Sequence, residues 1–191
     1  MNNAVARCVL CILWMALLVR PVSAAPFTAD SVYSLPPMRL SNQDGKEFSW
    51  DALAGQTRLL GMFYASCQEV CPYEITAIKA LEDELQRLHK PLLPVVLISL
   101  DPKDDQKALQ MEAAMHHLQA PGFQVVRIVD GDTGLLGGVL GISWRLIAPR
   151  QYVHKSLLTL VDATGHIVLQ EESIRLKEPL FRQQLFALLQ Q

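Results

Sequence analysis

The apolar and polar residues of this chain alternate in two rhythms, one typical of strands and one typical of helices. Residues 59–64 and 94–100 are almost wholly apolar, which predicts two buried strands. Between them, residues 72–88 carry isoleucines and leucines three and four positions apart, which predicts a helix with one apolar face. A strand, a helix and a second strand in this order form a βαβ unit, whose two strands lie in one parallel sheet.

Further elements precede and follow this unit. The turn signal at residues 42–45 predicts a hairpin between 38–40 and 46–48, and a second hairpin is predicted between 157–161 and 166–170. The other predicted elements are a helix over 104–118 with Ala108, Met111 and Met115 turned inward, a strand over 124–129, a short helix capped by Asp132 and ending near Leu140, and a helix over 176–189. This order predicts an α/β fold, a thioredoxin-like sandwich with a central mixed sheet flanked by helices and an N-terminal β-hairpin.

The first 24 residues have the pattern of an export signal. Their apolar run, residues 9–19, is shorter than the roughly 20 residues that span a bilayer, and residues 22–24 are the small residues of a cleavage site. We therefore expect a cleaved leader, with an uncleaved membrane anchor as the alternative. The mature protein is then periplasmic or otherwise exported. Residues 25–37 are predicted to be a linker, and residues 38–191 to be one domain.

The charge of the chain argues against one class of partner. The sequence has 17 basic and 19 acidic side chains, a formal net charge of −2, and no run of basic residues. A nucleic-acid-binding protein needs a basic surface to neutralise phosphates. Nucleic acid is therefore not an expected partner, and contact with a membrane is expected only through an uncleaved leader.

Cys67 and Cys71 are the two cysteines that remain once the leader is removed. They lie between the predicted strand 59–64 and the predicted helix 72–88, where thioredoxin-like folds carry their functional cysteines. In an exported protein, a cysteine pair commonly forms a structural disulfide. Closing so short a loop, however, removes little entropy from the unfolded chain, and a helix N-terminus lowers the pKa of a thiol. Both arguments favour a functional pair.

One histidine is a candidate partner for the two thiols. His154 precedes the predicted strand 157–161, and in a thioredoxin-like fold the loop before that strand approaches the cysteine-bearing junction. Two thiolates and one imidazole make a soft three-coordinate site, which suits Cu(I) and, with an added ligand, Cu(II). A structural zinc site would need a fourth protein ligand, and none suggests itself. The alternative is a solvated loop histidine.

Other polar residues are predicted to be structural. His116 and His117 are adjacent at a helix end and cannot share one helix face, so we expect both in solvent. Asp101 follows the second buried strand, where a turn with Pro102 is favoured over a position beside the cysteines.

Three blocks of the sequence resemble the SCO/SenC proteins. They are residues 63–72 (FYASCQEVCP), 98–105 (ISLDPKDD) and 154–165 (HKSLLTLVDATG), and the opening 40–46 (LSNQDGK) also fits. The resemblance covers nearly the whole chain after the leader. It implies a thioredoxin-like fold and a copper site made of Cys67, Cys71 and His154. It also implies a role in building the binuclear copper centre of cytochrome c oxidase, by copper delivery, by thiol reduction or by both, with the copper-bearing subunit as acceptor.

The sequence departs from the family pattern at three places. Val153 stands where members commonly carry an acid before the histidine, and Asp104 stands where they carry an arginine. Gln68 and Glu69 replace the commoner Pro-Asp between the cysteines. An acid at position 153 would orient the imidazole, so its absence bears on metal affinity and not on the ligand set. We therefore expect a divergent member.

Two hypotheses from different classes follow. In the first, the protein is a copper chaperone or assembly factor that holds one copper ion through Cys67, Cys71 and His154. In the second, it is a thiol-disulfide oxidoreductase with Cys67 and Cys71 as its catalytic redox pair and disulfide-bearing proteins as partners. A peroxidase would need a cation such as arginine beside the reactive thiolate, and the cysteine block contains none. A binding module with a structural disulfide would bind no metal.

Overall fold

The structure is a computed structural model that describes residues 27–68, 70–118 and 122–189. The proposed leader, residues 1–24, therefore lies outside the described residues, as does Glu69 between the cysteines. Within these three ranges, no helix is both long enough and apolar enough to cross a membrane.

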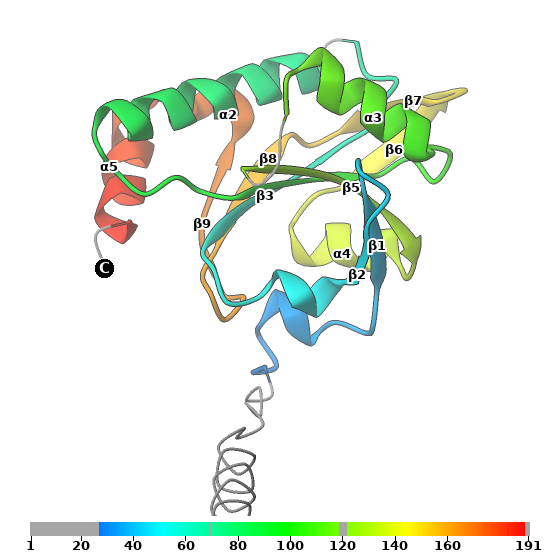
Figure 1. The fold of residues 1–191 in the computed structure, drawn as a ribbon, viewed down its shortest axis with the longest axis horizontal. Coiled ribbons are helices and arrows are strands. Elements are labelled where there is room, and N and C mark those ends of the chain that lie inside the picture. Colours follow the sequence, from blue (N-terminus) through cyan, green and yellow to red (C-terminus); the bar gives the residue numbers. More distant parts are fainter. Residues whose placement is uncertain (1–26, 69, 119–121, 190–191) are drawn as a thin grey trace, which may run out of the picture.

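A seven-stranded mixed sheet forms the centre of the molecule (Figure 1). Its strands follow the order β2-β1-β5-β4-β3-β8-β9. Their bounds are β1 Arg39–Asn42, β2 Glu47–Ser49, β3 Arg58–Phe63, β4 Val95–Ser99, β5 Phe123–Asp130, β8 Leu157–Val161 and β9 Ile167–Glu172. Strands β3, β4 and β5 run parallel, whereas β1, β2, β8 and β9 pair antiparallel. The predicted βαβ unit, both predicted hairpins and the mixed character of the sheet are thus present.

Helices cover both faces of this sheet. Figure 1 shows α2 and α3 across one face and α4 on the other, with α5 beside the end of α2. The bounds are α2 Val70–Arg87, α3 Gln106–Met115, α4 Thr133–Val139 and α5 Pro179–Leu188, with short 3-10 helices η1 Val32–Ser34, η2 Trp50–Leu53 and η3 Ser173–Arg175. The described part of the expected linker packs on the domain, because Val32 and Tyr33 are buried and Trp50 Nε1 donates to the Val32 carbonyl at 2.7 Å.

The apolar runs became strands because they are covered on both sides. Every residue of β3 and of β4 is buried, as expected for parallel strands between two helical layers. Helix α2 buries Ile75, Ile78, Leu81 and Leu85 against the sheet, so its three- and four-residue spacing is a core-facing stripe. This packing fixes the start of α2 at the carboxyl end of β3, where the cysteines lie.

Helix α3 buries different residues from those predicted. Met111 and Met115, expected to face inward, are 57% and 64% exposed, while Leu109, Glu112 and Ala113 are buried. The prediction was wrong because a carboxyl group occupies one core-facing position, and a hydrophobicity criterion assigns such a residue to solvent. Burial raises the pKa of Glu112 to about 7.

A separate two-stranded sheet was not predicted. Strands β6 Trp144–Ala148 and β7 Gln151–His154 form a hairpin that pairs with no strand of the central sheet. None of its residues is fully buried, so its few apolar residues, such as Leu146 and Ile147, do not form the long buried run that marks β3 and β4. Its turn contains Arg150 with φ +57°, a backbone conformation that residues other than glycine rarely adopt. The turn residues are Pro149 and Arg150, so the Asn-Gly or Asp-Gly pair that usually marks a tight hairpin turn is missing here.

Gly61 in β3 faces side chains of α2 and of neighbouring strands. A Cβ atom there would lie 2.8 Å from Glu74 Oε1 and 2.8 Å from Leu158 Cδ2. We expect Gly61→Ala to lower the free energy of unfolding by about 1–3 kcal/mol, because these neighbours must move. Urea denaturation measures this change. Gly138→Ala is the control, since nothing lies within 4 Å of the added Cβ. Equal midpoints for the two variants would contradict the expected crowding.

Candidate functional site

The cysteine pair lies where β3 leads into α2, as the sequence predicts. Cys67 follows β3 in the connecting turn, and Cys71 is the second residue of α2. Cys71 is buried, Cys67 is partly exposed, and no disulfide joins them. The backbone N–H of Cys71 donates a hydrogen bond to Cys67 Sγ at 3.3 Å. A donor at the start of a helix stabilises negative charge on the Cys67 sulfur.

The Cys71 thiol holds its proton firmly. The hydrogen bond to Cys67 and burial in the core both raise the pKa of the Cys71 thiol. Cys67 is the thiol that reaches the surface. An incoming partner therefore meets Cys67 first, with Cys71 held behind it.

His154 joins the cysteines from a distant part of the chain. It ends β7, and its Nε2 lies 3.8 Å from the Sγ of Cys71, 83 residues earlier. Its Nδ1 lies 3.3 Å from the Lys155 carbonyl oxygen, and the Tyr64 ring packs edge-on against the imidazole. Burial lowers the pKa of His154, but the hydrogen bond with Cys67 and the charge of Glu74 outweigh it and raise the pKa. His154 is thus part of the site and not a solvated loop residue.

Three charged residues fasten the hairpin that carries His154. Asp101 and Asp104 follow β4, and their side chains are fully buried. Arg150, in the β6–β7 turn, places Nε 3.1 Å from Asp101 Oδ2 and Nη2 2.5 Å from Asp104 Oδ1. Ion pairs that are also hydrogen bonds are among the stronger polar contacts in proteins. We call Asp101, Asp104 and Arg150 the hairpin clamp.

Asp101 also keeps the turn that the sequence predicts. Its Oδ1 accepts a hydrogen bond from the Lys103 backbone N–H at 2.9 Å, so the turn role is confirmed. The same oxygen accepts from the Tyr152 hydroxyl at 3.1 Å. One carboxylate therefore shapes its own loop and holds β7, which places Asp101 beside the site after all.

Asp104 connects the hairpin clamp to the cysteine loop. It accepts hydrogen bonds from the Ala65 backbone N–H at 2.8 Å and from Ser99 Oγ at 2.6 Å. Two further bonds join the same elements directly. Ser66 Oγ donates to the Arg150 carbonyl at 2.7 Å, and the Tyr64 hydroxyl donates to the Tyr152 carbonyl at 3.1 Å. The loop with Cys67 and the strand with His154 are therefore held by one polar network.

Glu74 is a buried acid near the site that sequence reasoning missed. It lies one turn after Cys71 on the core-facing side of α2, and Ser156 Oγ donates a hydrogen bond to it. Burial raises its pKa to about 7. A charged residue one position before Ile75, within the inward stripe of the helix, was the signal that could have revealed it.

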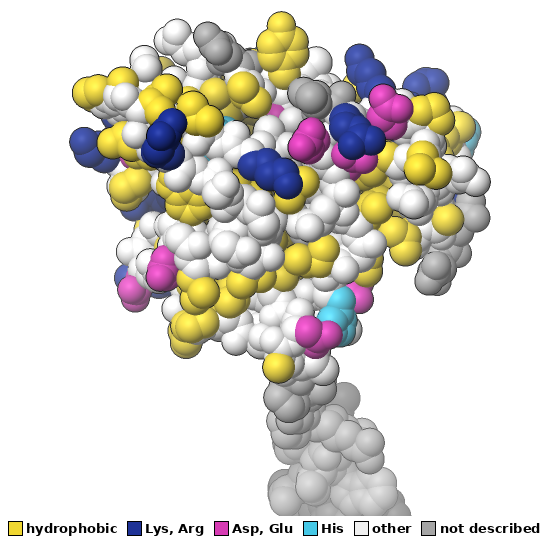
Figure 2. All heavy atoms as spheres, turned by 180° about the vertical axis from the view of Figure 1, so that it is seen from behind, with side chains coloured by type: hydrophobic (Ala, Val, Ile, Leu, Met, Phe, Trp, Pro, Cys, Tyr) yellow, Lys and Arg dark blue, Asp and Glu magenta, His cyan; other side chains and the backbone are white. Residues whose placement is uncertain are grey.

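A cavity of about 520 Å³ opens beside Cys67 and His154. Val70, Ile147 and Val153 line it, although each is between 41% and 55% exposed. Hydrophobic and basic side chains are interspersed at the upper left of Figure 2, the side from which the β6–β7 hairpin projects. Exposed apolar residues gathered around a partly exposed thiol are typical of a surface that receives another protein.

Arg150 lines the same cavity and bears on the peroxidase alternative. That reading needs a cation beside the thiolate, and the structure brings an arginine from 83 positions beyond Cys67 into the cavity. Its guanidinium, however, faces the two carboxylates of the hairpin clamp. The positive charge is therefore already compensated and does not favour a peroxidatic thiolate.

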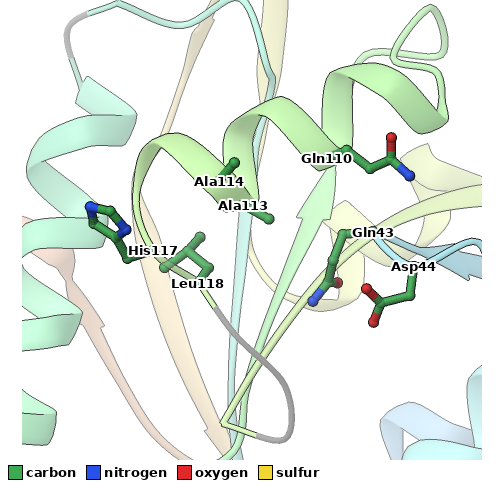
Figure 3. Close-up of a pocket in the computed structure, with 7 residues that line it drawn as sticks. All are labelled: Gln43, Asp44, Gln110, Ala113, Ala114, His117 and Leu118. Atoms are coloured by element: carbon green, nitrogen blue, oxygen red, sulfur yellow. The ribbon is translucent and has the colours of Figure 1, made fainter.

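His116 and His117 lie apart from the cysteine pair, but only His117 is exposed as predicted, because the His116 side chain is 18% exposed. His116 Nε2 lies 3.4 Å from Glu112 Oε1. His117 lines a separate cavity of about 300 Å³, and Figure 3 shows its imidazole turned away from Asp44. In the described ranges, no three His, Cys, Asp or Glu side chains are grouped so that they could hold a metal ion as they stand. The cysteine pair and His154 would therefore have to adjust to close on one ion.

The fold and the site define a thioredoxin-like α/β domain with a reduced thiol pair at its first strand-to-helix junction. The family model described as SCO1/SenC matches residues 30–127. The chain therefore belongs to the SCO1/SenC family, and the resemblance found in the sequence blocks is confirmed.

Individual relatives agree with this assignment. A SCO1 protein homolog of Bacillus subtilis is 29% identical over 87 residues, which are 45% of this chain and 45% of that protein. The chain thus spans less than half of that relative in the match. Among solved structures, a SCO1/SenC family lipoprotein of Bacillus anthracis has a TM-score of 0.66 at 18% identity, covering 82% of this chain and 95% of that one. Arabidopsis thaliana ScoI with copper bound has a TM-score of 0.63 at 17% identity, covering 81% and 97%. These structures confirm the predicted fold.

Proposed function

We propose that the protein is an exported copper-binding assembly factor that holds one copper ion through Cys67, Cys71 and His154. In this proposal it passes the ion to a copper-bearing acceptor and helps to mature the binuclear copper centre of cytochrome c oxidase. The observation that carries the proposal is the 3.8 Å approach of His154 Nε2 to Cys71 Sγ, from 83 residues away. The copper bound to the Arabidopsis relative supports the choice of metal.

The observed separation fits two ligands of one ion. With bonds of about 2.3 Å to sulfur and about 2.0 Å to nitrogen at about 120°, one ion separates its two ligand atoms by about 3.7 Å, close to the observed distance. Thiolates and imidazole are a donor set that suits copper. Cys67 Sγ accepts a hydrogen bond from the Cys71 N–H, and rotation of this one side chain would release it as the third ligand. A site that closes in this way also opens readily.

The Lys155 carbonyl offsets the missing acid at position 153. It lies 3.3 Å from Nδ1 of His154 and accepts a hydrogen bond when this nitrogen carries the proton. That tautomer leaves the lone pair of Nε2 directed at the cysteines, which is the orienting role of a carboxylate next to a metal-bound histidine. A valine at 153 is therefore compatible with a functional ligand set.

Transfer of the ion follows from the low coordination number. Three protein ligands leave room for a donor from the acceptor, so copper passes by ligand exchange without a bare ion in solution. Cys67, partly exposed beside the cavity, is the ligand that an incoming donor replaces first. In this proposal, residues 1–24 are the leader that brings the domain to the exported location. The lipoprotein among the relatives supports an exported or membrane-associated setting.

An anaerobic titration of the reduced protein against a chromophoric Cu(I) competitor tests the proposal. We expect one tightly held copper per chain, and an affinity at least about tenfold lower in His154→Ala. His116→Ala is the matched control, because that imidazole contacts Glu112 and not the cysteines. Failure of the wild-type protein to compete for copper would refute the metal site. Equal affinities for wild type and His154→Ala would remove the histidine from it.

A thiol-disulfide oxidoreductase is the second candidate, and the asymmetry of the two thiols favours it. An exposed thiol that receives an N–H hydrogen bond, followed by a buried thiol with a raised pKa, is an arrangement for attack followed by resolution. This function predicts a defined reduction potential and turnover with a disulfide-bearing protein. A pair that is inert towards such a substrate would eliminate it.

A further inference from the structure

A second large cavity lies at the end of the central sheet opposite to the cysteines. Strand β3 ends at Phe63 beside the cysteine loop and begins at Arg58, which lines this cavity of about 960 Å³. Pockets of this size are typical of small-molecule sites. The walls combine apolar and polar side chains, among them Phe48, Leu53, Arg58, Leu92, Leu93 and Gln124.

Arg58 is a buried cation without a carboxylate partner. It is 6% exposed, and its Nε has no hydrogen-bond partner among the described residues. No ion pair within the described ranges includes it. Its side chain is hydrogen-bonded to the Tyr33 hydroxyl, which is a neutral group. A buried charge without a counter-charge is strongly unfavourable, so a bound anion at this position would reduce the free-energy penalty of burying the guanidinium.

The surrounding acids do not supply the counter-charge. Asp162, next to the β8 partner of Arg58, accepts hydrogen bonds from Thr164 and His166 instead. Asp44 also lines the cavity, but among the described residues it forms no ion pair with Arg58. Residues 119–121, which precede the wall residue Gly122, are glutamine, alanine and proline, and contain no acid. The guanidinium of Arg58 therefore remains the uncompensated charge.

Gln124 adds a second unsatisfied group on the same face of the sheet. Leu60 pairs with Val96, and Val96 pairs with Gln124, so these three side chains point to one side. Arg58 lies two residues before Leu60 and points to that side as well. The Oε1 atom of Gln124 is buried without a partner, like the Nε of Arg58. One cavity thus presents an unused donor with a positive charge and an unused acceptor.

We propose that this cavity binds a small organic carboxylate with an apolar chain. The planar guanidinium of Arg58 receives the carboxylate, for which its paired donors are suited. Leu53, Leu92 and Leu93 pack against the apolar chain. Gln124 Oε1 is available to a ligand that also carries a hydroxyl or amide hydrogen. The site is separate from the cysteines, so it adds a binding activity that the proposed copper function does not require.

Calorimetric titration of the whole protein with octanoate, below its micelle concentration, tests this site. We expect saturable binding, and an affinity at least about tenfold lower in Arg58→Met, since a hydrogen bond to a charged group contributes this much. Octan-1-ol, which lacks the charge, should bind at least about tenfold more weakly than octanoate. Arg127→Met is the matched control, because Arg127 Nε is also buried without a partner but does not line the cavity.

A second variant, Leu92→Asp, keeps the test valid if Arg58→Met does not fold. Leu92 is a 56% exposed wall residue, so Leu92→Asp should fold and should weaken octanoate binding by placing a like charge in the cavity. Cu(I) affinity should stay at the wild-type value in both variants, which separates this site from the copper proposal. Absence of octanoate binding to wild type, or binding unchanged in Leu92→Asp, would overturn the proposal.

Discussion

Replacing Cys71 by serine is expected to lower the affinity for Cu(I) by more than about 100-fold, because even the partners that orient metal ligands contribute about 10- to 100-fold. The hydroxyl of serine keeps the size of the side chain but loses the soft thiolate that Cu(I) prefers. Cys71 is the buried member of the pair and lies 3.8 Å from His154 Nε2, so no other sulfur takes its place. The Cu(I) competition titration measures this loss.

The control for Cys71→Ser removes a sulfur elsewhere. Met115 is 64% exposed on α3, so Met115→Ser should leave Cu(I) affinity unchanged. Cys67→Ser should cause a loss of the same order as Cys71→Ser if both thiolates bind the ion. Equal copper affinity in wild type and Cys71→Ser would end the three-ligand hypothesis, whatever the result for Cys67→Ser.

Removing the arginine of the hairpin clamp is expected to have the second large effect. Arg150→Ala leaves Asp101 and Asp104 buried without their cation, and breaking a buried ion pair typically costs about 3–5 kcal/mol. The Arg150 side chain is 41% exposed, so we expect a loss of about 3 kcal/mol in the free energy of unfolding. Cu(I) affinity should fall as well, because the strand with His154 loses its anchor on the cysteine loop.

Urea denaturation of Arg150→Ala and Arg39→Ala separates this effect from the general loss of an ion pair. Arg39 pairs with Glu47 at 3.6 Å, and both side chains are more than half exposed. Such a surface pair contributes at most about 1 kcal/mol. Arg150→Lys should be intermediate, because one ammonium group keeps the charge but cannot bind both carboxylates in the guanidinium geometry. Matching midpoints for Arg150→Ala and Arg39→Ala would show that the hairpin clamp contributes no more to the free energy of unfolding than a surface ion pair.

The parts of the fold that were predictable are those in which burial leaves a continuous trace in the sequence. β3 and β4 are buried along their whole length, so their sequences are continuous apolar runs from which both strands could be predicted. The β6–β7 hairpin has no fully buried residue, so its strands have no such trace. Helix α3 was placed correctly but rotated wrongly, because the buried Glu112 occupies an inward position.

The sequence predicted that Cys67, Cys71 and His154 lie together, but not the contacts that hold them there. The spacing of the cysteines and the position of His154 before β8 were enough to bring the three residues together. The hairpin clamp was not visible, because Arg150 meets Asp101 and Asp104 across 49 and 46 residues. Asp104 stands where the family commonly carries an arginine. In the structure it pairs with a cation from the hairpin, Arg150, whose position in space could not be read from the sequence.

The separation of the β6–β7 hairpin from the central sheet has a consequence for the proposed copper site. No backbone ladder joins β7, the strand of His154, directly to β3, the strand before the cysteines. The distance between His154 and the cysteines is therefore set by the hydrogen bonds between the hairpin and the cysteine loop and by the short link from β7 to β8. An ion shared by both bodies would restrict the hairpin, and by thermodynamic reciprocity anything that restrains the hairpin would tighten the hold on the ion. A partner that binds the exposed side of this hairpin would therefore bind the copper-loaded and the copper-free protein with different affinities. Its binding would in turn change the affinity of the protein for the ion.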